Sequence, residues 1–145
     1  MQTQNPNFRQ KVQEIFERAA FIEDLGVKLG ETGIGWCETT LDISPRHLQQ
    51  DSFIHAGVQA TMADHTAGGA GGSIIREDEI VLSVEFKINL LRPAVGQSLR
   101  CKANVLKAGK TLIVVESEVF TSDGTREKLT AKATVTLVVK RKDEG

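Results

Sequence analysis

The sequence has little cysteine, no long apolar run and no excess of charge of one sign. Its two cysteines, Cys37 and Cys101, are too few for a disulfide framework and lack the spacing of a metal site, so we expect free thiols. No apolar run approaches the roughly 20 residues of a membrane helix, and the first residues lack the pattern of a secretory signal. Because 18 Lys and Arg offset 19 Asp and Glu, the charge gives no reason to expect nucleic acid binding. These absences predict a soluble, cytoplasmic protein with neither a membrane nor a nucleic acid as its partner.

What is present is the composition of one globular domain. A chain of 145 residues with 40% hydrophobic residues can bury a core without metal or disulfide staples. There are no internal repeats and no low-complexity linker, so we expect a single domain over 1–145. Within it we expect an N-terminal helical segment over 1–20 and a solvated, frayed tail over 140–145.

Hydrophobic periodicity divides the chain into helices and strands. Apolar residues at helical spacing predict a helix over about 7–20, and alternation of apolar and polar residues predicts a strand over about 35–43. Four further alternating segments predict strands at 82–90, 100–105, 112–120 and 129–139. Short turns join these four, which favours an antiparallel meander with one apolar and one polar face. On this alternation Ser83 lies on the polar face.

Residues 55–75 show no alternation and consist mainly of Ala, Gly and other small residues, with glycines clustered at 68, 69, 71 and 72. We interpret this segment as a central helix, although each glycine weakens a helix by up to about 1 kcal/mol relative to Ala. The missing side chains would allow a sheet or a partner to approach the helix closely. The fold class is therefore α+β, with one sheet burying its apolar face on this helix.

The residues that carry chemistry gather where the central helix begins. The backbone N–H groups of Ala56 and Gly57 open the helix without intrahelical partners, so they can hold an oxyanion. His55 lies at the same point, and Asp64 is a carboxylate in an otherwise small and apolar helix. The same residues also fit a structural interpretation, in which His55 caps the helix and Asp64 faces water or a cation. These residues alone leave both interpretations open.

A resemblance to a known family favours the functional interpretation. His55-Ala56-Gly57, with Asp64 nine residues after the histidine, resembles the signature of the PaaI-like acyl-CoA thioesterases of the hotdog-fold superfamily. The similarity extends over about residues 20–139, including the strand of residues 82–94 and the turns at 107–110 and 121–124.

The family resemblance implies a hotdog fold, in which a five- to six-stranded antiparallel sheet wraps a long central helix. It also implies a homodimer, often a dimer of dimers (a homotetramer), with active sites at the dimer interface and no metal or redox cofactor. His47, His55 and His65 lack close metal-ligand spacing, which agrees with the expectation of no metal.

The resemblance further assigns roles within the site. Asp64 would be the general base or nucleophile, and Ser83 would position the hydrolytic water. The Ala56 N–H would polarise the thioester carbonyl, while His55 orients the thioester and Gly57 helps the turn. Asp64 and Ser83 would face His55 and Ala56 of the other chain.

The sequence departs from the family at two places. The first glycine of the motif is Ala56 here, and Gln49, followed by Gln50, stands where relatives often place an Asn. The coenzyme A phosphates would need cations, for which Arg92, Lys107 and Lys110 are candidates, with Gln50 as a further substrate-binding residue.

The function that these observations favour is hydrolysis of a small-to-medium or aromatic acyl-CoA to the free acid and CoA. One alternative is a noncatalytic acyl-CoA-binding module. Another is a hydratase or dehydratase of the same fold, but the Tyr-rich signature of that branch is absent from a chain without tyrosine.

Overall fold

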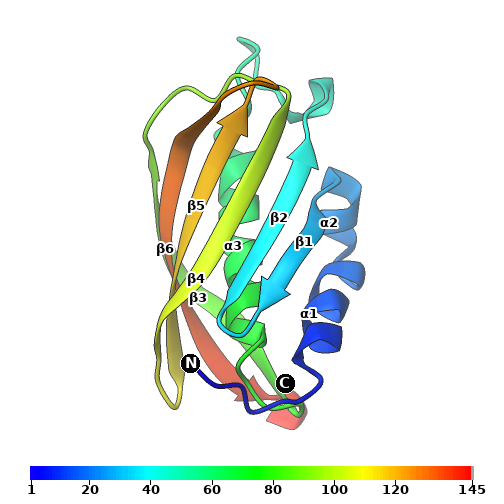
Figure 1. The fold of residues 1–145 in the computed structure, drawn as a ribbon, viewed down its shortest axis with the longest axis vertical. Helices are drawn as coiled ribbons and strands as arrows, with labels where there is room; N and C mark the ends of the chain where they lie inside the picture. The colour runs from blue at the N-terminus through cyan, green and yellow to red at the C-terminus, as the bar shows by residue number, and fades with distance from the viewer. Residues whose placement is uncertain (145) are drawn as a thin grey trace.

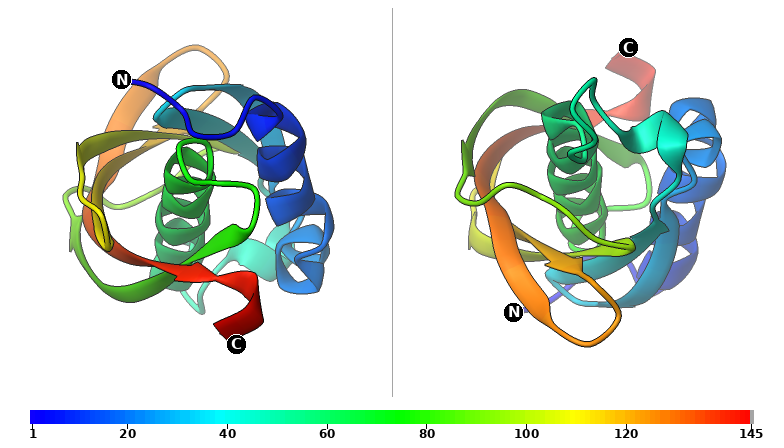
Figure 2. Two further views of the ribbon diagram at one scale, coloured as in Figure 1. Left: turned by 90° about the horizontal axis from the view of Figure 1, so that it is seen from below. Right: turned by 90° about the horizontal axis from the view of Figure 1, so that it is seen from above.

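In the computed structural model, which describes residues 1–144, one antiparallel sheet wraps around a central helix (Figure 1). The helices are α1 (Phe8–Glu17), α2 (Ala20–Leu25) and α3 (Ala56–Gly72), with short 3-10 turns at Pro45–His47 and Lys142–Glu144. The strands are β1 (Lys28–Gly33), β2 (Trp36–Asp42), β3 (Glu79–Leu90), β4 (Ser98–Ala108), β5 (Leu112–Ser122) and β6 (Glu127–Arg141). Seen along α3, the sheet curls around one side of the helix, while α1 and α2 lie on the other (Figure 2). The predicted α+β hotdog fold is confirmed.

The strand order is β1-β2-β4-β5-β6-β3, with antiparallel neighbours throughout. The predicted meander is therefore right for β4, β5 and β6 but wrong for β3, which pairs with β6 and not with β4. The connection over 91–97 is not a hairpin turn, because β3 and β4 are not neighbours in the sheet. Strand β4 lies between β2 and β5. Since the curled sheet does not close, β1 and β3 are its two edges.

The N-terminal part of the chain differs from the sequence prediction. The N-terminal helix stops at Glu17, because Ala19 is extended (φ −93°, ψ 92°) and a second helix starts after it. The sequence prediction also missed β1, whose alternation is interrupted by a register shift between Leu29 and Thr32.

The predicted frayed tail over 140–145 is wrong for the part that the structure describes. Strand β6 continues to Arg141, and the Lys142 N–H donates to the Asp78 carbonyl at 2.9 Å. Gly145 lies outside the described residues.

The concave face of the sheet holds α3 through small side chains and buried hydroxyl groups. Ala63, Ala67 and Ala70 are fully buried, and the Ser117 hydroxyl of β5 donates to the Ala63 carbonyl at 2.7 Å. The Thr66 hydroxyl lies 2.8 Å from the Thr39 hydroxyl of β2. Because these polar groups are paired, the sheet can bury its side of the helix without leaving a buried polar group unsatisfied.

Three of the four clustered glycines are explained by close packing, as the sequence predicted. A Cβ atom on Gly69 would lie 2.8 Å from the Cys37 sulfur, and one on Gly71 would overlap a Leu137 methyl group. Gly72 faces Ile15 of α1 in the same way. Packing against the sheet does not explain Gly68, because a Cβ atom there would have no neighbour of the same chain within 4 Å, and close approach of a partner at Gly68 stays a prediction.

Candidate active site

One stripe of α3 is left uncovered by the sheet. Residues that are partly or fully exposed recur along it at helical spacing: Gly57, Ala60, Thr61, Asp64, His65 and Gly68. The other faces of the helix are buried against the sheet and α1. Asp64 thus lies in the middle of the only α3 face that a substrate could reach.

Asp64 has one close partner, from β3. The Ser83 hydroxyl donates to the Asp64 carboxylate at 2.5 Å. Ser83 lies opposite Leu137, a core residue, so it points toward the helix and not from the polar face that the alternation predicted. The reason is a bulge at Val84, which shifts the register between Ser83 and Glu85 and reverses the facing of the strand.

His65, beside Asp64, is a residue whose role the sequence did not indicate. Its Nε2–H donates to the Ile15 carbonyl of α1 at 3.0 Å, and its ring meets Phe16 edge-on at 4.6 Å. Burial lowers the pKa of His65, although the Ile15 carbonyl and the Asp64 carboxylate act in the opposite direction. The neutral ring therefore fastens α1 against α3 next to the Asp64 carboxylate.

At the start of α3, His55 is the N-cap residue. Its Nδ1 accepts the Gly57 N–H at 2.8 Å, so that donor is occupied and the expectation of a free Gly57 N–H is wrong. The Ala56 N–H points out of the helix end and makes no hydrogen bond within residues 1–144. Ala56 therefore supplies the available backbone donor here.

Gln49 and Gln50 lie next to this helix start. The Gln49 side-chain oxygen accepts the backbone N–H groups of Asp51 and Phe53, and its NH₂ group has no acceptor within residues 1–144. A cavity of about 530 Å³ joins the two glutamines to His55, Ala56 and Arg92, among others.

The two groups of candidate residues are separate within one chain. Asp64 follows His55 by nine residues, and at 1.5 Å per residue these positions are about 13 Å apart along α3. Asp64 and Ser83 line a different cavity of about 450 Å³, between α1 and β3. One chain therefore presents two separate groups of candidate residues, a carboxylate with a hydroxyl and a helix start with amide donors.

The side chains predicted to bind the CoA phosphates also lie in two separate places. Arg92 lies with the helix start and also shares a cavity of about 330 Å³ with Arg126 and Lys128, which the sequence did not single out. Lys107 and Lys110 lie near the β4–β5 hairpin, at the opposite end of β4 from Ser98 and the Arg92 region. Within one chain they are not brought to the helix start.

Other parts of the molecule offer little for chemistry. Burial raises the pKa of both Cys37 and Cys101 to about 12, so these thiols are unreactive core residues, as expected. Among the described residues, no three His, Cys, Asp or Glu side chains cluster as a metal site would require, and no helix has the length and apolarity to cross a membrane.

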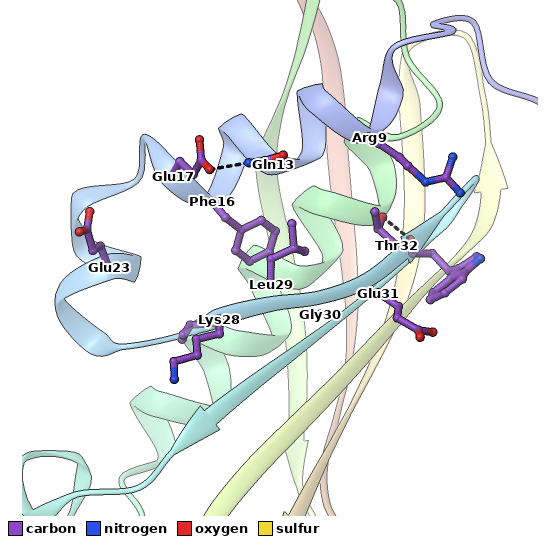
Figure 3. A pocket seen from close by; sticks show the side chains of 12 residues that line it. Arg9, Gln13, Phe16, Glu17, Glu23, Lys28, Leu29, Gly30, Glu31 and Thr32 are labelled. Carbon is purple, nitrogen blue, oxygen red and sulfur yellow. Dashed lines mark hydrogen bonds between the residues drawn. The ribbon is translucent and has the colours of Figure 1, made fainter.

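A cavity of about 1090 Å³ lies between α1 and β1, and no residue of α3 or β3 lines it. Its wall mixes the cations Arg9 and Lys28 with the carboxylates Glu17, Glu23 and Glu31 around a Phe16 and Leu29 floor (Figure 3). None of the predicted site residues is part of it.

Comparison with known proteins decides the family. Residues 51–128, which include the start of α3, Asp64 and Ser83, match the model of the thioesterase superfamily. The chain belongs to the thioesterase superfamily. This confirms the predicted family and the predicted class of enzyme, a thioester hydrolase.

Individual relatives and solved structures resemble the chain over most of its length. A thioesterase family protein from Silicibacter pomeroyi is 34% identical, with a TM-score of 0.90 over 93% of this chain and 99% of its own. The 1,4-dihydroxy-2-naphthoyl-CoA hydrolase of Listeria monocytogenes is 28% identical over 83% of this chain and 95% of its own length. The PaaI protein of E. coli shares the fold, with a TM-score of 0.80 at 21% identity over 92% of both chains.

Proposed function

We propose that this thioesterase hydrolyses acyl-CoA thioesters at active sites shared by two copies of the chain. The observation that carries the proposal is the split site: a carboxylate paired with a hydroxyl, and about 12 Å away on the same helix a backbone N–H, that of Ala56, with no acceptor among the described residues. A thioester carbonyl needs a hydrogen-bond donor about 3 Å from its oxygen and, at the same time, a catalytic carboxylate close to its carbon. A second copy whose α3 runs antiparallel to the first would bring the partner's Ala56 to Asp64.

The exposed edge of β3 supports such a pairing. Within the described chain, β3 has a strand neighbour on one side only, and its outward-facing Leu82 and Val84 are exposed. An unpaired edge with apolar side chains is a template for a second strand. Pairing of two β3 edges would join the sheets and set the two α3 helices side by side.

In the proposed reaction, the thioester carbonyl lies between Asp64 of one protomer and the helix start of its partner. The Ala56 N–H donates to the carbonyl oxygen, and the NH₂ group of Gln49 is the second candidate donor. Charge that develops on this oxygen is stabilised by donors already fixed in place, each contributing about 10²–10³-fold to such rates. His55 holds the helix start in shape through its bond to the Gly57 N–H.

Asp64 acts on the carbonyl carbon in one of two ways. As a base it takes a proton from water, the water oxygen bonds to the carbon, and the C–S bond breaks to release CoA. As a nucleophile it forms an anhydride with loss of CoA, which water then cleaves to the acid and free Asp64. In either route Ser83, held 2.5 Å from the carboxylate, positions the water.

For the CoA moiety, Arg92, with Gln50 nearby, is the better placed of the predicted candidates, and Arg126 and Lys128 add positive charge beside it. A small-to-medium or aromatic acyl group and a cytoplasmic location remain predictions from the sequence. That the Listeria relative acts on an aromatic acyl-CoA supports the substrate class.

The test is release of free thiol from acetyl-, octanoyl-, palmitoyl- and benzoyl-CoA. We expect turnover of at least one ester, and a loss of 10²-fold or more in Asp64→Asn, because general base or nucleophilic catalysis contributes about that much. Asp42→Asn, which removes an exposed carboxylate at the end of β2, is the matched control and keeps wild-type turnover. Tight binding of every ester without thiol release would instead favour the noncatalytic binding module, and wild-type turnover by Asp64→Asn would exclude this carboxylate.

A further inference from the structure

The cavity beside Asp64 and Ser83 extends toward the C-terminal half of α3. It has a volume of about 450 Å³, within the range of about 300–1,000 Å³ that is usual for small-molecule pockets. Its walls come from α1, α3 and β3 and combine apolar side chains, among them Ile15, Ile75, Val81 and Leu137, with the charged Lys11, Glu14, Arg18 and Lys142. The cavity therefore offers an apolar surface, interrupted by charged groups, that begins at the two polar side chains of the candidate site.

Gly68 lies in the wall of this cavity, one helical turn after Asp64. Residues four apart lie on the same helix face, so Gly68 is directly beside the carboxylate. A Cβ atom on Gly68 would have no atom within 4 Å, whereas the neighbouring Gly69 is pressed against Cys37 and Phe16. Packing within the chain thus explains Gly69 but not Gly68, where a helix would favour Ala.

A smaller cavity, of about 290 Å³, lies on the other side of Asp64, toward the N-terminal half of α3. It includes Ala60 and Thr61 on the helix and Phe86 of β3. Asp64 and His65 line both cavities, so the carboxylate is at the junction of two spaces of different size. A thioester held at Asp64 can place its acyl group in one space and its CoA arm in the other.

We infer that Gly68 sets the size limit for the acyl group, which lies in the larger apolar cavity as a medium-length aliphatic chain or an aromatic ring. The inference rests on the proposed function and adds to it the direction of the acyl group and the residue that selects it. The missing side chain keeps the cavity open at the point nearest the reacting carbon. A methyl or isopropyl group there narrows the passage without touching the atoms that carry out the hydrolysis.

The test compares Gly68→Ala and Gly68→Val with the wild type, measuring kcat/KM for acetyl-, octanoyl- and benzoyl-CoA. We expect Gly68→Val to lower the value for the octanoyl and benzoyl esters by about tenfold or more, as overfilled hydrophobic pockets do, and to leave acetyl-CoA nearly unchanged. Gly68→Ala gives a smaller selective loss. Because the site around Gly68 is open, both variants keep the wild-type circular dichroism and do not lower Tm.

Ala60→Val is the matched control, since it adds similar bulk to the same helix face on the other side of Asp64. We expect Ala60→Val to change kcat/KM for all three esters by the same factor. An equal effect of Gly68→Val on all three esters, no effect on any of them, or acyl selectivity in Ala60→Val alone would overturn the inference while leaving the proposed function intact. If the wild type releases no thiol from any ester, the proposed function itself fails.

Discussion

At the scale of single residues, the candidate site depends on one short contact between distant parts of the chain. Asp64 and Ser83 are 19 positions apart, and their 2.5 Å hydrogen bond forms because Val84 is bulged out of β3. The bulge directs Ser83 toward the helix, while Leu82 and Val84 stay on the outer face. The bulge at Val84 thus decides whether the Asp64 carboxylate has the Ser83 hydroxyl as a partner that can position water.

The sequence indicated the candidate residues, but part of their geometry could not be predicted from it. His55 and Asp64 were predicted as a pair because their spacing resembles the family signature, and Ala56 followed from the orphan donors of a helix start. The facing of Ser83 was predicted wrongly, since alternation assumes an unbroken strand and a bulge leaves no clear mark in the residue pattern. The occupied Gly57 N–H was also missed, because side-chain capping by His55 depends on its rotamer.

The Ala56 N–H can be removed with little disturbance to the fold. Ala56 is the first helical residue, where proline is well tolerated, and His55 before it has the extended conformation (φ −59°, ψ 135°) that proline requires of its neighbour. We expect Ala56→Pro to lower kcat for acyl-CoA hydrolysis by about 10²–10³-fold, with unchanged circular dichroism. Wild-type kcat in a folded Ala56→Pro protein would rule out this N–H as the oxyanion donor.

At the scale of elements, the glycines of α3 serve two different purposes, one on its buried faces and one on its exposed stripe. Its buried faces must be flat enough for the sheet and α1, and its exposed stripe must leave room beside Asp64. The sequence indicated a small-residue helix but not which glycine served which face, because helical phase relative to the sheet is fixed only by tertiary packing. The missed strand β1 and helix α2 have the same origin, since short irregular segments gain their stability from neighbours and not from their own pattern.

Neighbouring glycines of α3 should respond to the same substitution with opposite sign. Gly68→Ala fills open space and gains helix propensity, so its free energy of unfolding should rise by about 0.5–1 kcal/mol. Gly69→Ala places a methyl group 2.8 Å from the Cys37 sulfur and 3.1 Å from the Phe16 ring in a closed core. Overpacking of this kind costs about 1–3 kcal/mol, which outweighs the propensity gain.

Urea unfolding of the two variants side by side measures both changes. The two proteins differ in the position of one methyl group, so their m values should agree. Stabilisation by Gly69→Ala, or destabilisation by Gly68→Ala, would contradict the assignment of these two faces of α3.

At the scale of the whole molecule, the free edge of β3 is the feature that the single chain does not explain. The edge exposes apolar side chains next to half of a site, while the other half lies at the far end of the same helix face. Both features are accounted for if two copies meet at this edge. The sequence could predict a dimer only through family resemblance, since neither periodicity nor composition distinguishes an edge strand from a central one.

A charge on the β3 edge should separate the protomers. Val84 and Leu106 are both bulged residues with 56% of their surface exposed, but Val84 is on edge strand β3 and Leu106 is on central strand β4. We expect Val84→Lys to be a monomer by light scattering, because lysine on an edge strand opposes pairing, and to lose thioesterase activity with it. Leu106→Lys should keep both the dimer and the activity. A Val84→Lys protein that is an active monomer would show that one chain suffices.

The most direct test of a site shared between two chains is complementation of two inactive variants. Asp64→Asn and Ala56→Pro are co-expressed with different affinity tags, and kcat is measured for the mixture against each variant alone. If the site crosses the interface, a mixed dimer has one intact pair, the Asp64 of one chain with the partner's Ala56, and random pairing of equal amounts restores about a quarter of wild-type activity. If both groups act within one chain, every site in the mixed dimer carries a defect. Activity of the mixture no higher than that of the separate variants, with mixed dimers present, would contradict the account.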